Sequence, residues 1–230
     1  MSQQRPPRRP AAGEPDELEG SLPHGRQAWI ALFVMAVVLA VVVGSGLLIK
    51  HATDPIVPSA LAGCTTSTQI ASHEFIGRQP MCIIASQKLQ ATVTTTQGDV
   101  VIQLHPEVAP VSVNNFVVLA LHGYYSGLSF WKAEDWVVQG GDPRGDGRGG
   151  PGYTLPEEPS GSPWDPGAVG MARVPGGPVN GSQFFIVKTS WPGSGPTAVY
   201  NRFGTVTSGL DKAQVLSVTD TIIAVTIKVS

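Results

Sequence analysis

Two glutamines are the side chains of this sequence whose positions most need a chemical explanation. Gln139 follows the apolar stretch 136–138, and Gln183 begins another strand-like stretch. Glutamine is rarely buried without hydrogen-bond partners, so we expect both amides to have a specific polar task. On the local pattern alone Phe185 is an ordinary core residue and Lys132 a solvated surface lysine. Two amides, an aromatic ring and a cation can bind and polarise a ligand, but they contain no acid–base pair.

Most other classes of catalytic site are excluded. The five histidines stand at positions 24, 51, 73, 105 and 122, without a close pair or a metal-ligand spacing. The pattern contains no credible Ser-His-Asp or Cys-His arrangement, and two cysteines cannot form a four-thiolate zinc site. A net charge of −2 offers no basic excess for general nucleic-acid binding. We therefore expect neither a metal nor a nucleic-acid partner.

A glycine-rich run spans residues 140–152, where seven of thirteen positions are glycine. Such a segment must turn tightly and lie against other backbone. It contains the spacing Gly145-x-Gly147-x-x-Gly150 of dinucleotide-binding loops, but Pro151 follows in place of a helix, and two aspartates would repel a phosphate. The aspartates also lack the spacing and the closing glutamate of a calcium-binding EF-hand loop. We therefore reject both ligand-binding interpretations.

The elements that must position these residues are mostly strands. Two β-rich segments flank Gly98, which can supply the left-handed conformation of a hairpin turn. Apolar residues recur at helical spacing from Val113 to Leu121, and Gly123 is placed to end that helix. We expect a hairpin of 91–96 and 99–104, a helix through 113–121, a short helix over 210–216 and a final strand over 222–229.

A membrane span is predicted ahead of this domain. Residues 28–49 are 22 consecutive positions without a charge. As a helix they measure about 33 Å, enough to cross a ~30 Å hydrocarbon core. Four arginines precede the span and one lysine follows it closely, which places the N-terminus in the cytoplasm. A cleaved signal peptide is the alternative, but its apolar region usually has about 7–15 residues. We favour an uncleaved anchor.

The two cysteines lie beyond the predicted span, on the outer and oxidising side. The run Leu61-Ala62-Gly63-Cys64 looks like a bacterial lipoprotein cleavage box, but residues 51–60 separate it from the apolar region. Without lipidation, Cys64 either forms a disulfide with Cys82, eighteen positions on, or remains a free thiol. We favour the disulfide, because paired thiols persist in such a compartment and the cross-link would stabilise by ~3 kcal/mol.

The composition, with 27 glycines, 20 prolines and 14% charged residues, agrees with a loop-rich β domain beside a membrane segment. Residues 1–27 are polar and proline-rich, which is typical of a disordered tail. Residues 50–87 show little periodicity and are interpreted as an extracytoplasmic spacer. The folded domain is expected over 88–230.

Four ordered blocks within residues 99–230 resemble the cyclophilin family of peptidyl-prolyl isomerases. The blocks are Ala109-Pro110 with Val113-Asn114-Asn115-Phe116, then Gly123-Tyr124-Tyr125-Ser126-Gly127-Leu128-Ser129-Phe130, then Val138-Gln139-Gly140-Gly141-Asp142-Pro143, and Gly170-Met171-Ala172 with Asn180-Gly181-Ser182-Gln183-Phe184-Phe185-Ile186. The resemblance implies a mainly β fold, a closed eight-stranded antiparallel barrel capped by two helices, preceded here by one transmembrane helix. It also implies cis-trans isomerisation of X–Pro bonds in proline-containing polypeptides, without a cofactor.

The resemblance also implies roles for single residues. Gln139 and Gln183 match glutamines that bond the substrate backbone, and Phe185 matches the floor of the proline pocket. Further matches at the substrate-binding face are Trp136, Val137, Ala172, Arg173, Trp191 and Tyr200. Trp191 requires a gap of two residues, so its match is loose.

The mouth of the expected pocket departs from the family pattern. Lys132 stands where the family has its principal catalytic arginine, so it keeps the charge without the planar fork. Glu134 and Asp135 replace the usual Pro-Gly and can draw Lys132 away from a substrate. Two hypotheses follow. One is an isomerase anchored in the cell membrane that assists the folding of exported proteins outside. The other is a proline-binding module that has lost most catalysis. We favour the first.

Overall fold

The computed structural model describes residues 57–174, 176–192 and 200–230. The predicted tail 1–27, the predicted span 28–49 and the first part of the predicted spacer lie outside these residues. Among the residues that are described, no helix is both long and apolar enough to cross a membrane.

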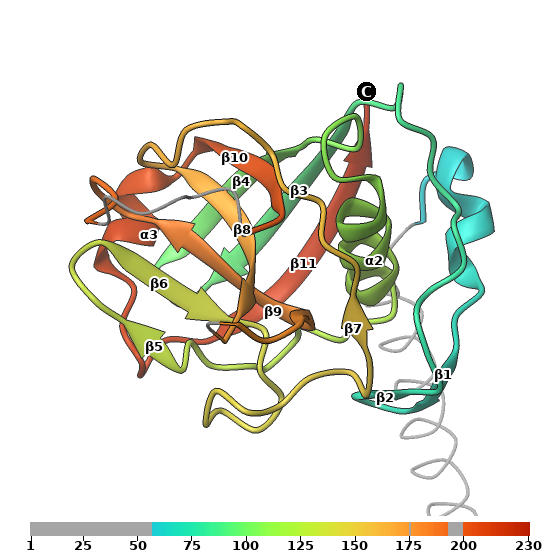
Figure 1. Cartoon of the computed structure of the whole chain (residues 1–230), viewed down its shortest axis with the longest axis horizontal. Coiled ribbons are helices and arrows are strands. Elements are labelled where there is room, and N and C mark those ends of the chain that lie inside the picture. Colours follow the sequence, from blue (N-terminus) through green and yellow to red (C-terminus); the bar gives the residue numbers. More distant parts are fainter. Residues whose placement is uncertain (1–56, 175, 193–199) are drawn as a thin grey trace, which may run out of the picture. The chain divides into compact units, whose positions relative to one another are not determined.

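One antiparallel sheet forms the body of the fold (Figure 1). Its strands follow the order β11-β3-β4-β10-β8-β9-β6-β5, and β7 pairs with β9. Their bounds are β3 (Leu89–Thr95), β4 (Gly98–Leu104), β5 (Lys132–Ala133), β6 (Val137–Gly140), β7 (Thr154–Leu155), β8 (Ala168–Arg173), β9 (Val179–Val187), β10 (Arg202–Ser208) and β11 (Ile222–Val229). In the described residues, two α-helices accompany the sheet, α2 (Pro110–Leu121) and α3 (Leu210–Val215).

The sheet curls into a half-barrel that stays open, so the prediction of a closed eight-stranded barrel is wrong. Within the described part of the chain, the end strands β11 and β5 share no strand pairing. A single isolated bridge between Ser129 and Thr221 joins the segments that precede them. β5 has two residues, so its ladder is too short to close the sheet. A ninth strand, β7, pairs with β9.

The other predicted elements of the domain are confirmed. Gly98 has a φ of +118° at the turn of the β3–β4 hairpin, and burial alternates along β3 with period two. The predicted helix is α2, and Gly123 beyond its end has a φ of +69°. α3 and β11 lie where the sequence predicted a short helix and a final strand.

The helix α2 is buried on all sides. Every residue from Ser112 to Ala120 is buried. One side packs against strands of the sheet, and the other is covered by the N-terminal segment of the described chain (Figure 1). An uncharged, mostly apolar helix suits such a position between two layers.

That N-terminal segment, residues 57–87, is named the strap here. It contains η1 (Ser59–Thr65), a 3-10 helix, and the two-stranded hairpin of β1 (Gln69–Ala71) and β2 (Glu74–Phe75). Leu61, Phe75 and Ile83 point into the main hydrophobic core. The predicted spacer 50–87 is therefore a packed part of the domain from residue 57 on. Its few buried residues are irregularly spaced, so no periodic pattern in the sequence predicted their burial.

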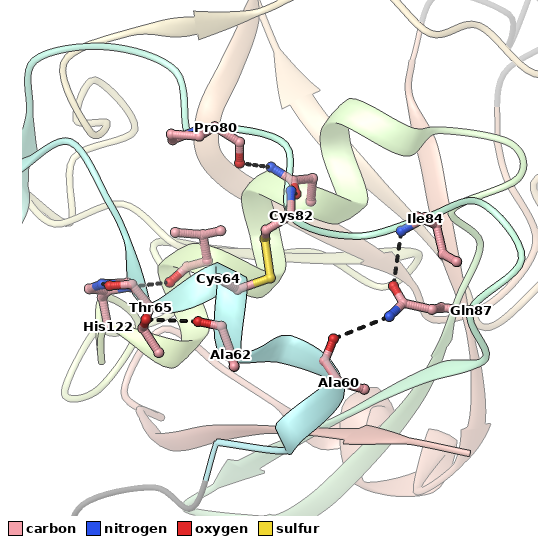
Figure 2. The surroundings of a disulfide bond; sticks show 11 residues. Ala60, Ala62, Cys64, Thr65, Pro80, Cys82, Ile84, Gln87 and His122 are labelled. Atoms are coloured by element: carbon pink, nitrogen blue, oxygen red, sulfur yellow. Dashed lines mark hydrogen bonds between the residues drawn. A yellow bond between two sulfur atoms is a disulfide. The ribbon is translucent and has the colours of Figure 1, made fainter.

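Cys64 of η1 and Cys82 are joined by a disulfide with an S–S distance of 2.06 Å (Figure 2). Both halves of the bridge are held against α2. The backbone N–H of Cys82 donates to Asn114 Oδ1 at 2.8 Å. On the other side, His122 Nε2 lies 3.0 Å from the carbonyl oxygen of Thr65. The cross-link joins two parts of the strap to each other, and hydrogen bonds on each side of it fasten the strap to α2 and to His122 just beyond the end of that helix.

Asp220 is expected to make the stability of the domain depend on pH. Its carboxylate accepts hydrogen bonds from Thr96 at 2.6 Å, from Gln97 at 2.8 Å and from the backbone N–H of Ser217 at 2.9 Å. These bonds lower the pKa of Asp220 from 3.8 to about 2. A lowered pKa means that the stabilisation is complete above about pH 4 and is lost as the pH falls toward 2.

Urea unfolding followed from about pH 5 to about pH 2 measures this loss. Asp220→Asn is expected to flatten the curve over the same interval, because the amide does not titrate. An equal fall in the variant and the parent would contradict the assignment.

Candidate active site

One pocket of about 540 Å³ is lined by all ten residues that the sequence predicted for the substrate-binding face. Most of them come from β5, β6, β8 and β9, and two lie in the chain after β9. The ten are Lys132, Trp136, Val137, Gln139, Ala172, Arg173, Gln183, Phe185, Trp191 and Tyr200. Even the loosely matched Trp191 belongs to this set. Their individual catalytic roles stay predictions.

Strand register explains why three of these residues meet. Lys132 in β5 pairs with Gln139 in β6, and Gln139 pairs with Phe185 in β9. Directly paired residues of antiparallel strands project from the same face. A cation, an amide and an aromatic ring therefore form one row across three neighbouring strands.

The floor of the pocket is a cluster of aromatic rings. The Phe185 ring centroid lies 5.3 Å from that of Tyr200 and 6.0 Å from that of Trp191, and Trp191 lies 5.0 Å from Trp136. Beneath them is Trp164, whose ring centroid is 5.1 Å from that of Phe185. The sequence analysis missed Trp164, because it lies in a proline-rich stretch without periodicity and its size was its one signal.

Gly170 in β8 leaves the space that Trp164 and Phe185 fill. A Cβ atom there would lie 2.5 Å from Trp164 Cη2 and 2.7 Å from Phe185 Cζ. Gly170→Ala is therefore expected to displace the Phe185 ring, because an inserted methyl group forces neighbouring side chains off their rotamers, and to weaken binding of a proline peptide about tenfold. Titration of the peptide against tryptophan fluorescence measures the affinity. Gly161→Ala is the control, because nothing lies within 4 Å of a Cβ there; equal affinities in both variants would contradict the prediction.

The two glutamines have different tasks. Gln183 is buried, and its Nε2 donates to the carbonyl oxygens of Gly147 at 3.1 Å and Gly149 at 2.8 Å. Its Oε1 accepts a hydrogen bond from Gln139 Nε2 at 3.0 Å. Within the described chain, no group donates to Gln139 Oε1. Gln183 thus holds the glycine-rich loop and orients Gln139, and Gln139 is the amide placed to meet a peptide.

The glycine-rich loop, residues 140–152, is shaped by the buried carboxylate of Asp142. This carboxylate accepts hydrogen bonds from the backbone N–H groups of Arg144 at 2.8 Å and Gly147 at 2.5 Å. Gly149 passes so close that a Cβ there would overlap Asp142 Oδ1. The loop therefore lies against other backbone, as predicted, and its aspartate serves the turn.

Two cations of the pocket are paired with carboxylates. Lys132 Nζ lies 3.1 Å from Glu134 Oε1 and 5.9 Å from the centroid of the Trp136 ring. The hydrogen bond from Lys132 is the main reason why the pKa of Glu134 is lowered. Arg173 Nη1 lies 2.7 Å from Glu157 Oε1. Glu134 thus makes the contact with Lys132 that the sequence led us to expect of the two acidic residues.

Comparison with known proteins agrees with this geometry. Residues 90–228 match the family described as cyclophilin type peptidyl-prolyl cis-trans isomerase/CLD. The chain belongs to the cyclophilin family. This cyclophilin is 46% identical over 118 residues to peptidyl-prolyl cis-trans isomerase B of Bacillus subtilis, which covers 50% of the chain and 80% of that protein. It is 39% identical over 135 residues to the peptidyl-prolyl cis-trans isomerase of Helicobacter pylori, which covers 57% of the chain and 78% of that protein.

Solved structures extend the similarity to the fold. A cyclophilin type peptidyl-prolyl cis-trans isomerase of Cryptosporidium parvum superposes with a TM-score of 0.56 at 27% identity, over 62% of this cyclophilin and 98% of that chain. The same protein solved in the presence of the dipeptide Ala-Pro gives a TM-score of 0.55 at 29% identity, over 60% and 98% of the two chains. The predicted family and the predicted isomerase activity are thereby confirmed.

Proposed function

We propose that this cyclophilin isomerises X–Pro bonds of exported polypeptides at the outer face of a cell membrane. Residues 28–49 would hold it there as a single span with a cytoplasmic N-terminus. The uncharged run and the four preceding arginines support this topology. A disulfide in the domain fits the same side, because disulfides persist in oxidising compartments.

The observation that carries the site is the row of Lys132, Gln139 and Phe185 in one pocket with an aromatic floor. The rotation barrier of an X–Pro bond is about 18–20 kcal/mol, and a site lowers it by binding the twisted amide better than either planar isomer. The proline ring rests on Phe185 and its neighbours, where an apolar surface disfavours the more polar planar amide. Gln139 holds the peptide backbone.

Lys132 acts as the electrostatic donor in this proposal. As the amide twists, the prolyl nitrogen regains its lone pair, and an ammonium aimed at it stabilises that state. No proton leaves or enters the substrate, so the site needs no acid–base pair.

The second candidate function is a proline-binding module with weak catalysis. The contact of 3.1 Å between Lys132 and Glu134 favours it, because an ammonium held by a carboxylate is less available to the prolyl nitrogen. Both candidate functions use the aromatic floor of the pocket to bind proline. They differ in whether Lys132 acts on the prolyl nitrogen.

Two measurements on the full-length protein test these proposals. Exchange NMR on a proline tetrapeptide, with the protein in detergent, gives turnover and binding in one sample. Accelerated exchange supports the isomerase, whereas shifted but unaccelerated resonances support the binding module.

For topology, protease added to spheroplasts is expected to digest the domain and spare the tail 1–27. A protected domain would refute the outer location without affecting the isomerase.

A further inference from the structure

The strap, residues 57–87, lies outside the family match, which begins at residue 90, yet it contacts the glycine-rich loop of the site. The backbone N–H of Phe75 donates to the carbonyl oxygen of Pro151 at 3.0 Å. Gln79 Nε2 donates to Tyr153 Oη at 3.0 Å. Between these contacts, a Cβ at Gly152 would lie 3.0 Å from the carbonyl oxygen of Phe75. The strap therefore touches the C-terminal end of the loop at backbone level.

Gln79 is buried and fully engaged in this contact. Its Oε1 accepts a hydrogen bond from the backbone N–H of Thr68 at 3.2 Å, which fixes the orientation of the amide. Tyr153 Oη in turn donates to Asn115 Oδ1 at 2.6 Å, and Asn115 Nδ2 donates to the carbonyl oxygen of Gly181 in β9 at 2.6 Å. A continuous path of hydrogen bonds thus runs from the strap through α2 to the strand that carries Phe185.

The middle of the same loop holds the two glutamines of the pocket in place through hydrogen bonds to Gln183. The carbonyl oxygens of Gly147 and Gly149 receive both hydrogen bonds from Gln183 Nε2, and Gln183 orients Gln139. Asp142 fixes the first part of the loop, and the strap fixes its last part. We expect release of the last part to shift these carbonyl oxygens and, through Gln183, the side chain of Gln139.

Hydrogen bonds with Asn114 of α2 keep the segment around Gln79 in place. Asn114 Nδ2 donates to the carbonyl oxygen of Pro80, directly after Gln79, at 2.9 Å, and its Oδ1 accepts from the N–H of Cys82. Cys82 is then cross-linked to Cys64 of η1. The backbone of residues 80–82 is thus held by the side chain of Asn114.

We propose that the strap is a positioning element of the proline site, which acts through Phe75 and Gln79 on the glycine-rich loop and through that loop on Gln183 and Gln139. Neither strap residue lines the pocket, so their part in the reaction is indirect. The inference rests on the isomerase site described above. It adds a requirement that the family match does not contain.

Gln79→Leu in the full-length protein tests the proposal, with Gln87→Leu as the matched control. Gln87 is a second strap glutamine, which bonds the carbonyl oxygen of Ala60 at 3.4 Å and the N–H of Ile84 at 3.0 Å, away from the loop. We expect Gln79→Leu to lower kcat/KM on a proline tetrapeptide about fivefold, mainly through KM, because a misplaced binding group loses rate without losing the fold. Gln87→Leu is expected to stay within about twofold of the parent.

Two further readouts separate positioning from general destabilisation. Tyr153→Phe removes the hydrogen bond to Gln79 from the other side, so the losses in kcat/KM of Tyr153→Phe and Gln79→Leu are expected to add to less than their sum in the double variant. Peptide affinity from tryptophan fluorescence needs no turnover, so it still reports on the strap if the parent proves a pure binding module. Equal kinetics and affinities of the Gln79 and Gln87 variants, or losses that follow Tm alone, would overturn the proposal.

Discussion

Lys132→Ala is expected to lower kcat/KM for a proline tetrapeptide about a hundredfold, the lower end of what removal of one oriented transition-state donor costs. Lys132→Arg is expected to raise kcat/KM above the parent, because a planar guanidinium offers two fixed donors in place of one mobile ammonium. Glu134→Gln is also expected to raise it, since the carboxylate 3.1 Å from the ammonium is then neutral. Exchange NMR measures all three variants on one peptide.

Lys212→Ala is the matched control for this series. Its ammonium also lies 3.1 Å from a carboxylate, that of Asp211, but on α3 and outside the pocket lining. We expect its kcat/KM to equal that of the parent. If Lys132→Ala retains the full rate of an active parent, Lys132 is not the catalytic cation, and Arg173 becomes the next residue to test.

Removal of the strap is expected to have the largest effect on stability. A fragment of residues 88–230 lacks the buried side chains of Leu61, Phe75 and Ile83 and exposes one side of α2. Each such side chain contributes about 1.5–3 kcal/mol. Together they approach the ~5–15 kcal/mol that separates a folded domain from its unfolded state. We expect this fragment to lack a cooperative urea transition.

The comparison requires a fragment of residues 57–230 and the same fragment with Cys64→Ser and Cys82→Ser. The first is expected to unfold cooperatively. The second separates the cross-link from the other buried side chains, and its lower midpoint measures the loss of the disulfide together with the loss of the buried Cys64 sulfur. A fragment 88–230 with the midpoint of the longer one would show that the strap is a passive attachment.

The pocket could be predicted from the sequence because its residues lie in short motifs with fixed spacing. Gly140 ends β6, Gly181 and Ser182 lie in β9, and once these strands pair, Gln139 and Phe185 are opposite each other. The division of labour between the glutamines could not be predicted, because it depends on which carbonyl oxygens the loop presents to Gln183.

Other features lacked a local pattern. Trp164 reaches the floor from a segment with no period, and Gly170 is needed because of that ring. The strap buries single residues between turns, so its sequence resembles a spacer. The sheet stays open because β5 has two residues. The apolar pattern around Lys132 did not predict how short this strand is.

The neighbouring positions of β3 and β11 have a consequence for synthesis of the protein. Leu89 pairs with Val229, so the first strand of the sheet and the last are partners along their whole length. The ribosome releases β3 long before β11, and until then β3 has one unpaired edge. A nascent chain that stops before Ile222 keeps that edge exposed. Completion of translation is therefore the step that covers it, and premature termination leaves a template for aggregation.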